Sequence, residues 1–217
     1  LRVYVDASSY EIGHLLRMQH SYYEMGGINF QSNSHLTMEN VNIYSCSGHA
    51  MTIGGTQQYT HFKNVNIVRP PNSERRAITC TADHLHISSS RGYIKIEDCE
   101  FSRGADDCIN FHDCTTFMYP YSATSLKTMN DRNTYLYAVG QTLEFRHGDY
   151  SPTDFSATVV ALNVLDAENG IREVVFDREL PEAYMDSFVL FNRAYDTSNI
   201  IVRNCYFHDN RARGILI

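Results

Sequence analysis

The chain has 217 residues, with 18 Lys and Arg against 25 Asp and Glu, and a formal net charge of −7 at pH 7. This acidic balance argues against nucleic acid as a partner, and no apolar run is long enough to predict a membrane span. The length suffices for one hydrophobic core or for a stack of repeats with an insertion, and it leaves the oligomeric state open.

An eight-residue phrase recurs four times along the chain. Its pattern is apolar-x-apolar-x-Asn/Asp-Val/Cys-x-Ile/Phe, and the second copy begins 24 residues after the first. Short alternating strands repeated at such a period are typical of a solenoid. The four copies occupy residues 36–43, 60–67, 94–101 and 200–207.

The Asn or Asp inside each phrase indicates a bend. The apolar residues change parity there, and a strand cannot switch faces without bending. Asn and Asp also tolerate the left-handed backbone that a bend needs. We therefore predict a column of bends at Asn40, Asn64, Asp98 and Asn204.

A second short strand follows each phrase at a fixed interval. It begins 15 residues after the start of the first, third and fourth phrases, and 25 after the start of the second, where a turn carries ten extra residues. These strands are expected at 51–53, 85–87, 109–111 and 215–217. The predicted fold class is all-β, a parallel β-helix (a solenoid), and its Asn-bearing bends are similar to those of right-handed pectin-lyase-like proteins.

Residues 112–199 break the repeat. They contain short runs, divided by Gly, Pro and Asp turns, that favour antiparallel strands at 134–137, 142–145, 157–164 and 173–176. We expect a small β-barrel or antiparallel sheet inserted between coils. The predicted organisation is β-helix coils over 1–114, the inserted barrel over 115–187, and a truncated β-helix continuation over 188–217 that resumes near Ser187–Phe191.

The repeat register places one column of residues two positions before the second strands. It contains His49, Asp83, Asp107 and Arg213. Neighbouring coils lie about 4.8 Å apart, so Asp83 and Asp107 should be close, with Asp106 beside them. Repulsion between such carboxylates raises at least one pKa and gives a protonated acid beside an ionised base, as glycoside hydrolysis requires. The alternatives are ordinary turn aspartates or a Ca²⁺ site.

Further polar residues flank this column. Two pairs, one on each of two neighbouring coils, are expected to face outward, and two arginines lie in the long turn. They are candidate contacts to sugar hydroxyls, or solvated residues that balance the acidic charge. The candidates are Arg75, Arg76, His84, His86, Asn110, His112 and Arg213.

Two stretches carry a specific resemblance. Thr81-Ala-Asp-His-Leu-His-Ile-Ser-Ser-Ser-Arg-Gly92 and Gly104-Ala-Asp-Asp-Cys-Ile-Asn-Phe-His112 resemble glycoside hydrolase family 110, which contains bacterial exo-acting α-1,3-galactosidases. The resemblance implies a right-handed β-helix carrying inserted β-barrels and an inverting mechanism without cofactor or metal. It also implies catalytic roles for Asp83, Asp106 and Asp107 and a periplasmic or extracellular location.

The chain departs from that family pattern at three positions. His84, Ser90 and Asp113 stand where the family usually has Gly, Cys and Gly, so the exact sugar stays open. The same stretch is also similar to polygalacturonases, whose later Gly-His-Gly and Arg-x-Lys motifs the chain lacks. The leading expectation is an inverting α-galactosidase acting on an oligosaccharide or polysaccharide. The alternatives are another β-helix glycan enzyme, such as a polygalacturonase or a lyase, and a non-catalytic carbohydrate-binding solenoid.

Overall fold

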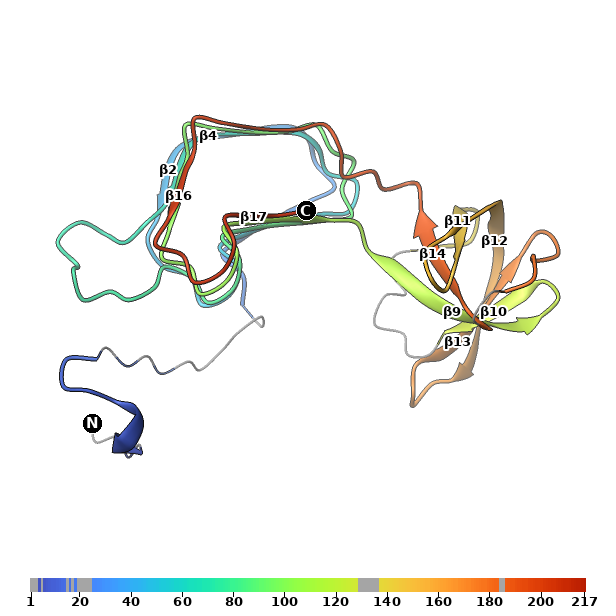
Figure 1. Cartoon of the computed structure of the whole chain (residues 1–217). Coiled ribbons are helices and arrows are strands. Elements are labelled where there is room, and N and C mark those ends of the chain that lie inside the picture. The colour runs from blue at the N-terminus through green and yellow to red at the C-terminus, as the bar shows by residue number, and fades with distance from the viewer. Residues whose placement is uncertain are drawn as a thin grey trace.

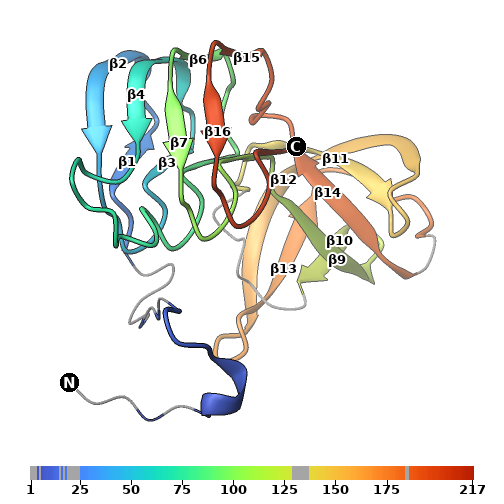
Figure 2. The same cartoon turned by 60° about the vertical axis from the view of Figure 1, so that its left-hand side comes forward.

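The computed structural model describes residues 4, 6–14, 16, 18, 25–128, 137–183 and 186–217. Over these ranges the protein is all-β, with one short 3₁₀ turn at Ala7–Ser9. Its strands form two parallel sheets and one closed barrel (Figures 1 and 2). Within the same ranges, no helix has the length and apolar character needed to cross a membrane.

The first parallel sheet has the strand order β1-β3-β5-β8-β17. Its strands are β1 Ile28–Gln31, β3 Met51–Gly54, β5 Leu85–Ser88, β8 Ile109–His112 and β17 Ile215–Leu216. Met51 pairs with Leu85, Leu85 with Ile109, and Ile109 with Ile215. This pairing confirms the register predicted for the second strands, including the ten-residue insertion before β5.

The second parallel sheet has the order β15-β6-β4-β7-β16, with β2 paired to β4. Its strands are β2 Ser34–Ile43, β4 Gln58–Ile67, β6 Ile94–Glu97, β7 Glu100–Ser102, β15 Ile200–Arg203 and β16 Tyr206–His208. We call the two parallel sheets and their turns, residues 28–112 and 200–216, the stacked region. Figure 1 looks along it, so that successive passes of the chain lie over one another.

The predicted bends are confirmed by the backbone. All four have left-handed φ values, and the Asn64 side-chain amide donates to Asn40 Oδ1 at 2.7 Å. Such amide contacts tie one pass to the next at the bend, because the same side chain recurs at the same place in each pass. The φ values are 58° at Asn40, 49° at Asn64, 56° at Asp98 and 53° at Asn204.

Apolar side chains from both parallel sheets fill the interior of the stacked region. In β5 the alternation is strict, with Leu85 and Ile87 buried and His86 and Ser88 half-buried on the outer face. Burial of each large aliphatic side chain contributes roughly 1.5–3 kcal/mol. Fully buried members of this core include Met51, Ile53, Phe62, Ile67, Leu85, Ile87, Ile96, Phe101 and Ile109.

A closed antiparallel barrel follows β8, with the strand order β10-β13-β12-β11-β14-β9. Its strands are β9 Thr115–Ser122, β10 Ser125–Thr128, β11 Thr142–His147, β12 Pro152–Asp166, β13 Ile171–Phe176 and β14 Phe188–Asn192. Three of them overlap strands expected from the sequence, at 142–145, 157–164 and 173–176. The strand expected at 134–137 lies outside the described residues except for Tyr137.

The return to the parallel sheets comes later than the sequence predicted. Ser187–Phe191 was expected to rejoin the coils, but β14 pairs with β9 and β11 in the barrel. The physical reason is that Phe188 and Leu190 are buried in the barrel core. The parallel pairing resumes only at β15, where Ile200 pairs with Ile94.

Candidate functional site

The aspartate column lies where the chain enters the strands of the first parallel sheet. The backbone N–H groups of residues 50, 84 and 108 donate to the carbonyl oxygens of Asp83, Asp107 and Arg213. The four column residues therefore sit on successive passes of the chain at equal height. This confirms the column that the repeat register predicted.

The three aspartates meet in one place. One side-chain oxygen from each of Asp83, Asp106 and Asp107 lies within 4.8 Å of the other two. Asp83 and Asp107 are buried, at 4% and 1% exposure, whereas Asp106 is half-buried. The Asp107 N–H also donates to Asp83 Oδ1 at 3.2 Å, which fixes the spacing of the two buried carboxylates.

Arg213 clamps Asp107 from the next pass of the chain. Its Nε donates to Oδ1 at 2.9 Å, its Nη2 to Oδ2 at 3.0 Å, and its backbone N–H to Oδ1 at 2.9 Å. This hydrogen bonding raises the pKa of Arg213, and a forked pair of this kind also fixes the carboxylate plane. Oδ2 of Asp107 accepts only one of these three hydrogen bonds, so it keeps a lone pair free for a further partner.

Asp83 is surrounded by imidazole and amide groups. His86 Nδ1 lies 2.7 Å and His49 Nδ1 3.7 Å from Asp83 Oδ2, and Asn110 Nδ2 donates to the same oxygen at 3.4 Å. Burial alone would raise the pKa of Asp83, but the hydrogen bond from His86 and the charges of the two imidazoles outweigh it. The pKa is therefore lowered, and Asp83 is ionised at neutral pH.

Asp106 has the opposite electrostatic environment. Burial, and after it the negative charges of Asp83 and Asp107, raises the pKa of its carboxyl group. No side chain among the described residues hydrogen-bonds this carboxyl group. Two neighbouring acids whose pKa values are pushed in opposite directions are the usual sign of an acid and base pair.

Three of the expected polar contacts lie on the outer face beside the aspartates. His86, Asn110 and His112 are half-buried there, and Asn110 and His112 occupy β8 next to His86 and Ser88 of β5. The Nε2 atoms of His86 and His112 are 3.2 Å apart. The outer face therefore presents a continuous row of hydrogen-bonding groups.

His84 does not join this row, contrary to the prediction that it faces outward. It is fully buried, its ring stacks on Phe101 with centroids 5.7 Å apart, and its Nε2 lies 3.1 Å from the Ser102 carbonyl oxygen. The cause is local, because residues 79–84, which precede β5, are all buried and lie outside any strand, so strand alternation does not apply to them. Burial lowers the pKa of His84 to about 4.

Arg75 and Arg76 lie away from the aspartates. Both are exposed in the long turn, and Arg76 donates to Ser45 Oγ and to the Ile78 carbonyl oxygen. In Figure 1 this turn, drawn in teal, projects away from the two sheets. Within the part of the chain that the structure describes, neither arginine contacts the aspartate column.

A pocket of about 450 Å³ lies on the outer face of β1, β3 and β5, and one of its lining residues, His86, contacts Asp83. The sequence analysis missed it, although the polar residues alternating along 28–31 and 51–54 were a usable signal. Its side-chain lining comes from the three strands and from the segment that follows β14. Six of its nine lining residues are Gln31, Thr52, Gly54, His86, Ser88 and Tyr195.

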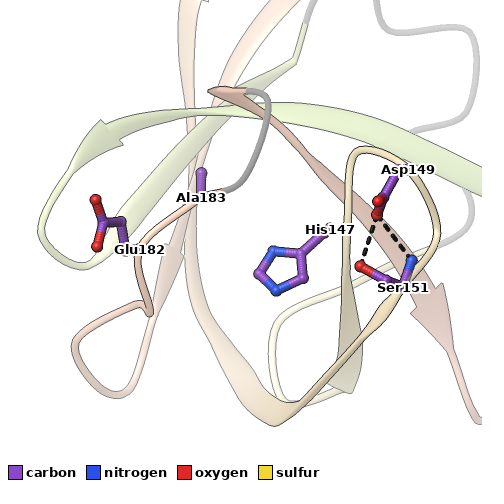
Figure 3. A pocket seen from close by; sticks show the side chains of 5 residues that line it. All are labelled: His147, Asp149, Ser151, Glu182 and Ala183. Atoms are coloured by element: carbon purple, nitrogen blue, oxygen red, sulfur yellow. Dashed lines mark hydrogen bonds between the residues drawn. The ribbon is translucent and has the colours of Figure 1, made fainter.

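A separate pocket of about 490 Å³ lies on the barrel (Figure 3). Asp149 accepts hydrogen bonds there from the Ser151 backbone N–H at 3.0 Å and from its hydroxyl at 2.6 Å. Glu182 lies across the pocket, with His147 between the two acids in the view of Figure 3. The two acids are therefore not arranged as a carboxylate pair.

No family model matches the chain, but it is similar to curated enzymes. It is 26% identical over 216 residues to alpha-1,3-galactosidase B of Bacteroides thetaiotaomicron, covering 94% of this chain and 33% of that protein. It is 27% identical over 192 residues to alpha-1,3-galactosidase A of Bacteroides fragilis, covering 84% and 31%. It is 25% identical over 219 residues to alpha-1,3-galactosidase A of Shewanella woodyi, and the match covers 95% of this chain and 34% of that protein. The chain thus spans about a third of the length of the curated relatives it matches.

Proposed function

We propose that the chain carries the catalytic centre of a glycoside hydrolase that removes a terminal α-linked galactose, or a closely related sugar, from a glycan. The observation that carries this proposal is the cluster of Asp83, Asp106 and Asp107, with opposite pKa shifts at Asp83 and Asp106. The similarity to proteins named alpha-1,3-galactosidase supplies the sugar. Glycoside hydrolysis needs an acid to protonate the leaving oxygen and a carboxylate base or nucleophile.

The environments of the three acids favour one division of roles. Asp106 has the raised pKa and the more accessible side chain, so it is the proton donor to the glycosidic oxygen. Asp83 is ionised and accepts a proton from the attacking water. Asp107, oriented by Arg213, holds the same water. A general acid or base in such a position contributes about 10²–10⁴-fold to the rate.

Inversion of the anomeric centre is part of the proposal and rests on the resemblance of residues 81–112. The nearest oxygens of the three acids lie within 4.8 Å, whereas inverting enzymes hold their two carboxyl groups about 6.5–9.5 Å apart. Inversion therefore requires the Asp106 side chain to turn outward toward the glycosidic oxygen. Proton NMR of the first product decides the matter: β-galactose supports inversion, and α-galactose refutes it.

We also propose a right-handed parallel β-helix as the fold and a periplasmic or extracellular location. Successive parallel pairing and the Asn bends support a right-handed parallel β-helix interrupted by the barrel. The family resemblance of residues 81–112 is the support for a periplasmic or extracellular location.

Hydrolysis of a panel of para-nitrophenyl glycosides by the full-length protein tests the function. We expect release from the α-galactoside, unchanged by a chelator. Loss of activity with the chelator, together with an unsaturated sugar product, would instead identify a cation-dependent lyase that uses the same aspartates. In a pH series, Asp106→Asn should abolish the fall in rate at high pH that deprotonation of the acid causes, while Asp106→Glu should keep it.

A further inference from the structure

We propose that the pocket on the outer face of β1, β3 and β5 is the subsite for the sugar to which the terminal galactose is attached. This inference rests on the proposed function and names the neighbouring part of its substrate. The pocket volume of about 450 Å³ is within the usual range for small-molecule sites. His86 is the link, because it lines the pocket and also contacts Asp83 at 2.7 Å.

The floor of the pocket is set by the register of the parallel strands. Asn29 pairs with Thr52, and Thr52 pairs with His86, so these outward side chains form one row across the sheet. Two residues further on, Gln31 pairs with Gly54, and Ser88 follows on β5. A regular array of hydroxyl, amide and imidazole groups suits the closely spaced hydroxyls of a sugar ring.

Hydrogen bonds within the floor orient its polar groups. The Thr52 hydroxyl donates to Asn29 Oδ1 at 2.8 Å, and Gln31 Nε2 donates to the same oxygen at 2.9 Å. These contacts direct the Gln31 amide across the floor before a ligand arrives. Fixed polar groups of this kind lower the ordering cost of binding.

Gly54 leaves room that a side chain would fill. A Cβ atom there would lie 2.8 Å from Gln31 Nε2 and 3.3 Å from the Ser88 carbonyl oxygen. Its backbone is ordinary strand, so the position tolerates a side chain conformationally. A larger residue at Gly54 would therefore fill the pocket, displace Gln31 and press on the Ser88 carbonyl oxygen.

The side wall of the pocket comes from the inserted segment. Tyr195 follows β14, packs against the barrel core, and is one of the residues that line the pocket. An aromatic ring beside a polar floor offers an apolar surface to the C–H face of a sugar. The barrel thereby contributes to binding although the aspartates lie on the stacked region.

The lining also fixes the charge of the ligand. The pocket contains no Asp, Glu, Lys or Arg, and its nine lining residues all belong to the described part of the chain. A uronic acid would bury its carboxylate there with no cationic partner other than His86, which already contacts Asp83. The subsite therefore takes a neutral sugar. It extends from His86, which contacts Asp83 of the aspartate column, toward Ser88. Ser88 lies five positions after Asp83, which is about 16 Å of extended chain.

The test compares two substrates in the full-length protein. Galactosyl-α-1,3-galactose occupies both subsites, whereas α-galactosyl fluoride has no second sugar. We expect Gln31→Ala to lower kcat/KM for the disaccharide by about three- to tenfold, and Gly54→Val and Tyr195→Ala by about tenfold or more. Activity on the fluoride should stay within about twofold of wild type. Tyr121→Ala, an exposed tyrosine of β9, is the matched control and should change neither.

The outcomes separate this inference from the proposed function. Equal losses on both substrates in folded variants, or no loss on either, would overturn the subsite. If wild type hydrolyses neither substrate, the proposed function fails. The subsite is then tested by measuring sugar binding to the pocket with calorimetry. The disaccharide should bind at least about tenfold more tightly than methyl α-galactoside, and Gly54→Val should remove the difference. Equal affinities for the two sugars in wild type would refute the subsite.

Discussion

Replacing His84 with Phe should remove a pH-dependent part of the stability of this protein. His84 is fully buried, and burial lowers its pKa from 6.5 to about 4. In the unfolded chain His84 is therefore protonated as the pH falls through about 6.5, whereas in the folded protein it is protonated only near pH 4. The stabilisation is complete above pH 6.5 and is lost as the pH falls, with a total of about 3 kcal/mol between pH 7 and pH 4.

Phenylalanine suits the test because it keeps the ring on Phe101. The Ser102 carbonyl oxygen, which His84 Nε2 approaches, also accepts a hydrogen bond from the Thr79 hydroxyl at 2.6 Å, so it keeps a partner. Urea unfolding followed by circular dichroism at pH 7, 5.5 and 4.5 gives the free energy of unfolding. The His84→Phe variant should lose markedly less stability than wild type over this range.

The control is His35→Phe, since His35 is exposed and its ring stacks on Tyr59 with centroids 4.8 Å apart. It should show the pH dependence of wild type. If His84→Phe instead shows the full wild-type dependence, the protons responsible bind elsewhere, and the buried neutral state assigned to His84 is wrong.

Three further predictions concern the proposed catalytic site and the long turn. Asp107→Asn should lower kcat by about 10²–10⁴-fold with an unchanged circular dichroism spectrum; a folded variant with full activity would remove Asp107 from the mechanism. Arg213→Gln should lower kcat at least about tenfold with little change in KM, because the substitution frees the Asp107 carboxylate, which Arg213 orients. Arg213→Lys should recover only part of the loss. Arg75→Ala and Arg76→Ala, singly and together, should leave kcat/KM within about twofold of wild type, because among the described residues neither arginine contacts the aspartates and their turn projects from the two sheets. A tenfold rise in KM would place the turn against the substrate.

The register of the phrases predicted much of the stacked region. Counting residues from each phrase was enough to predict that Asp83 and Asp107 lie close together. The prediction held because parallel pairing repeats the same offset on every pass. The bends at Asn40 and Asn64 followed from their tolerance of left-handed backbone. These features depend on local sequence and on repetition, and both are visible in one chain.

Prediction failed where long-range packing decides. His84 was expected outside because alternation was carried back past the start of β5 into a turn whose residues are all buried. Phe188–Asn192 has the alternation of any half-buried strand, and only its partners β9 and β11 show that it belongs to the barrel. Likewise, Tyr195 lines the outer-face pocket because of how the chain returns from the barrel to the stacked region, and no local sequence pattern predicts that.

The place of the barrel in the chain has a consequence for how this protein folds. Ile94 and Ile200 are paired neighbours in the sheet although the barrel separates them in the sequence. Closing a loop of 106 residues rather than 24 costs about 1.3 kcal/mol more in chain entropy. Thr197 donates to Asp113 from its hydroxyl at 2.6 Å and from its backbone N–H at 3.2 Å, so the two ends of the insertion are tied together. A barrel that forms early would present these ends side by side and shorten the loop. The last passes would then assemble only after the barrel.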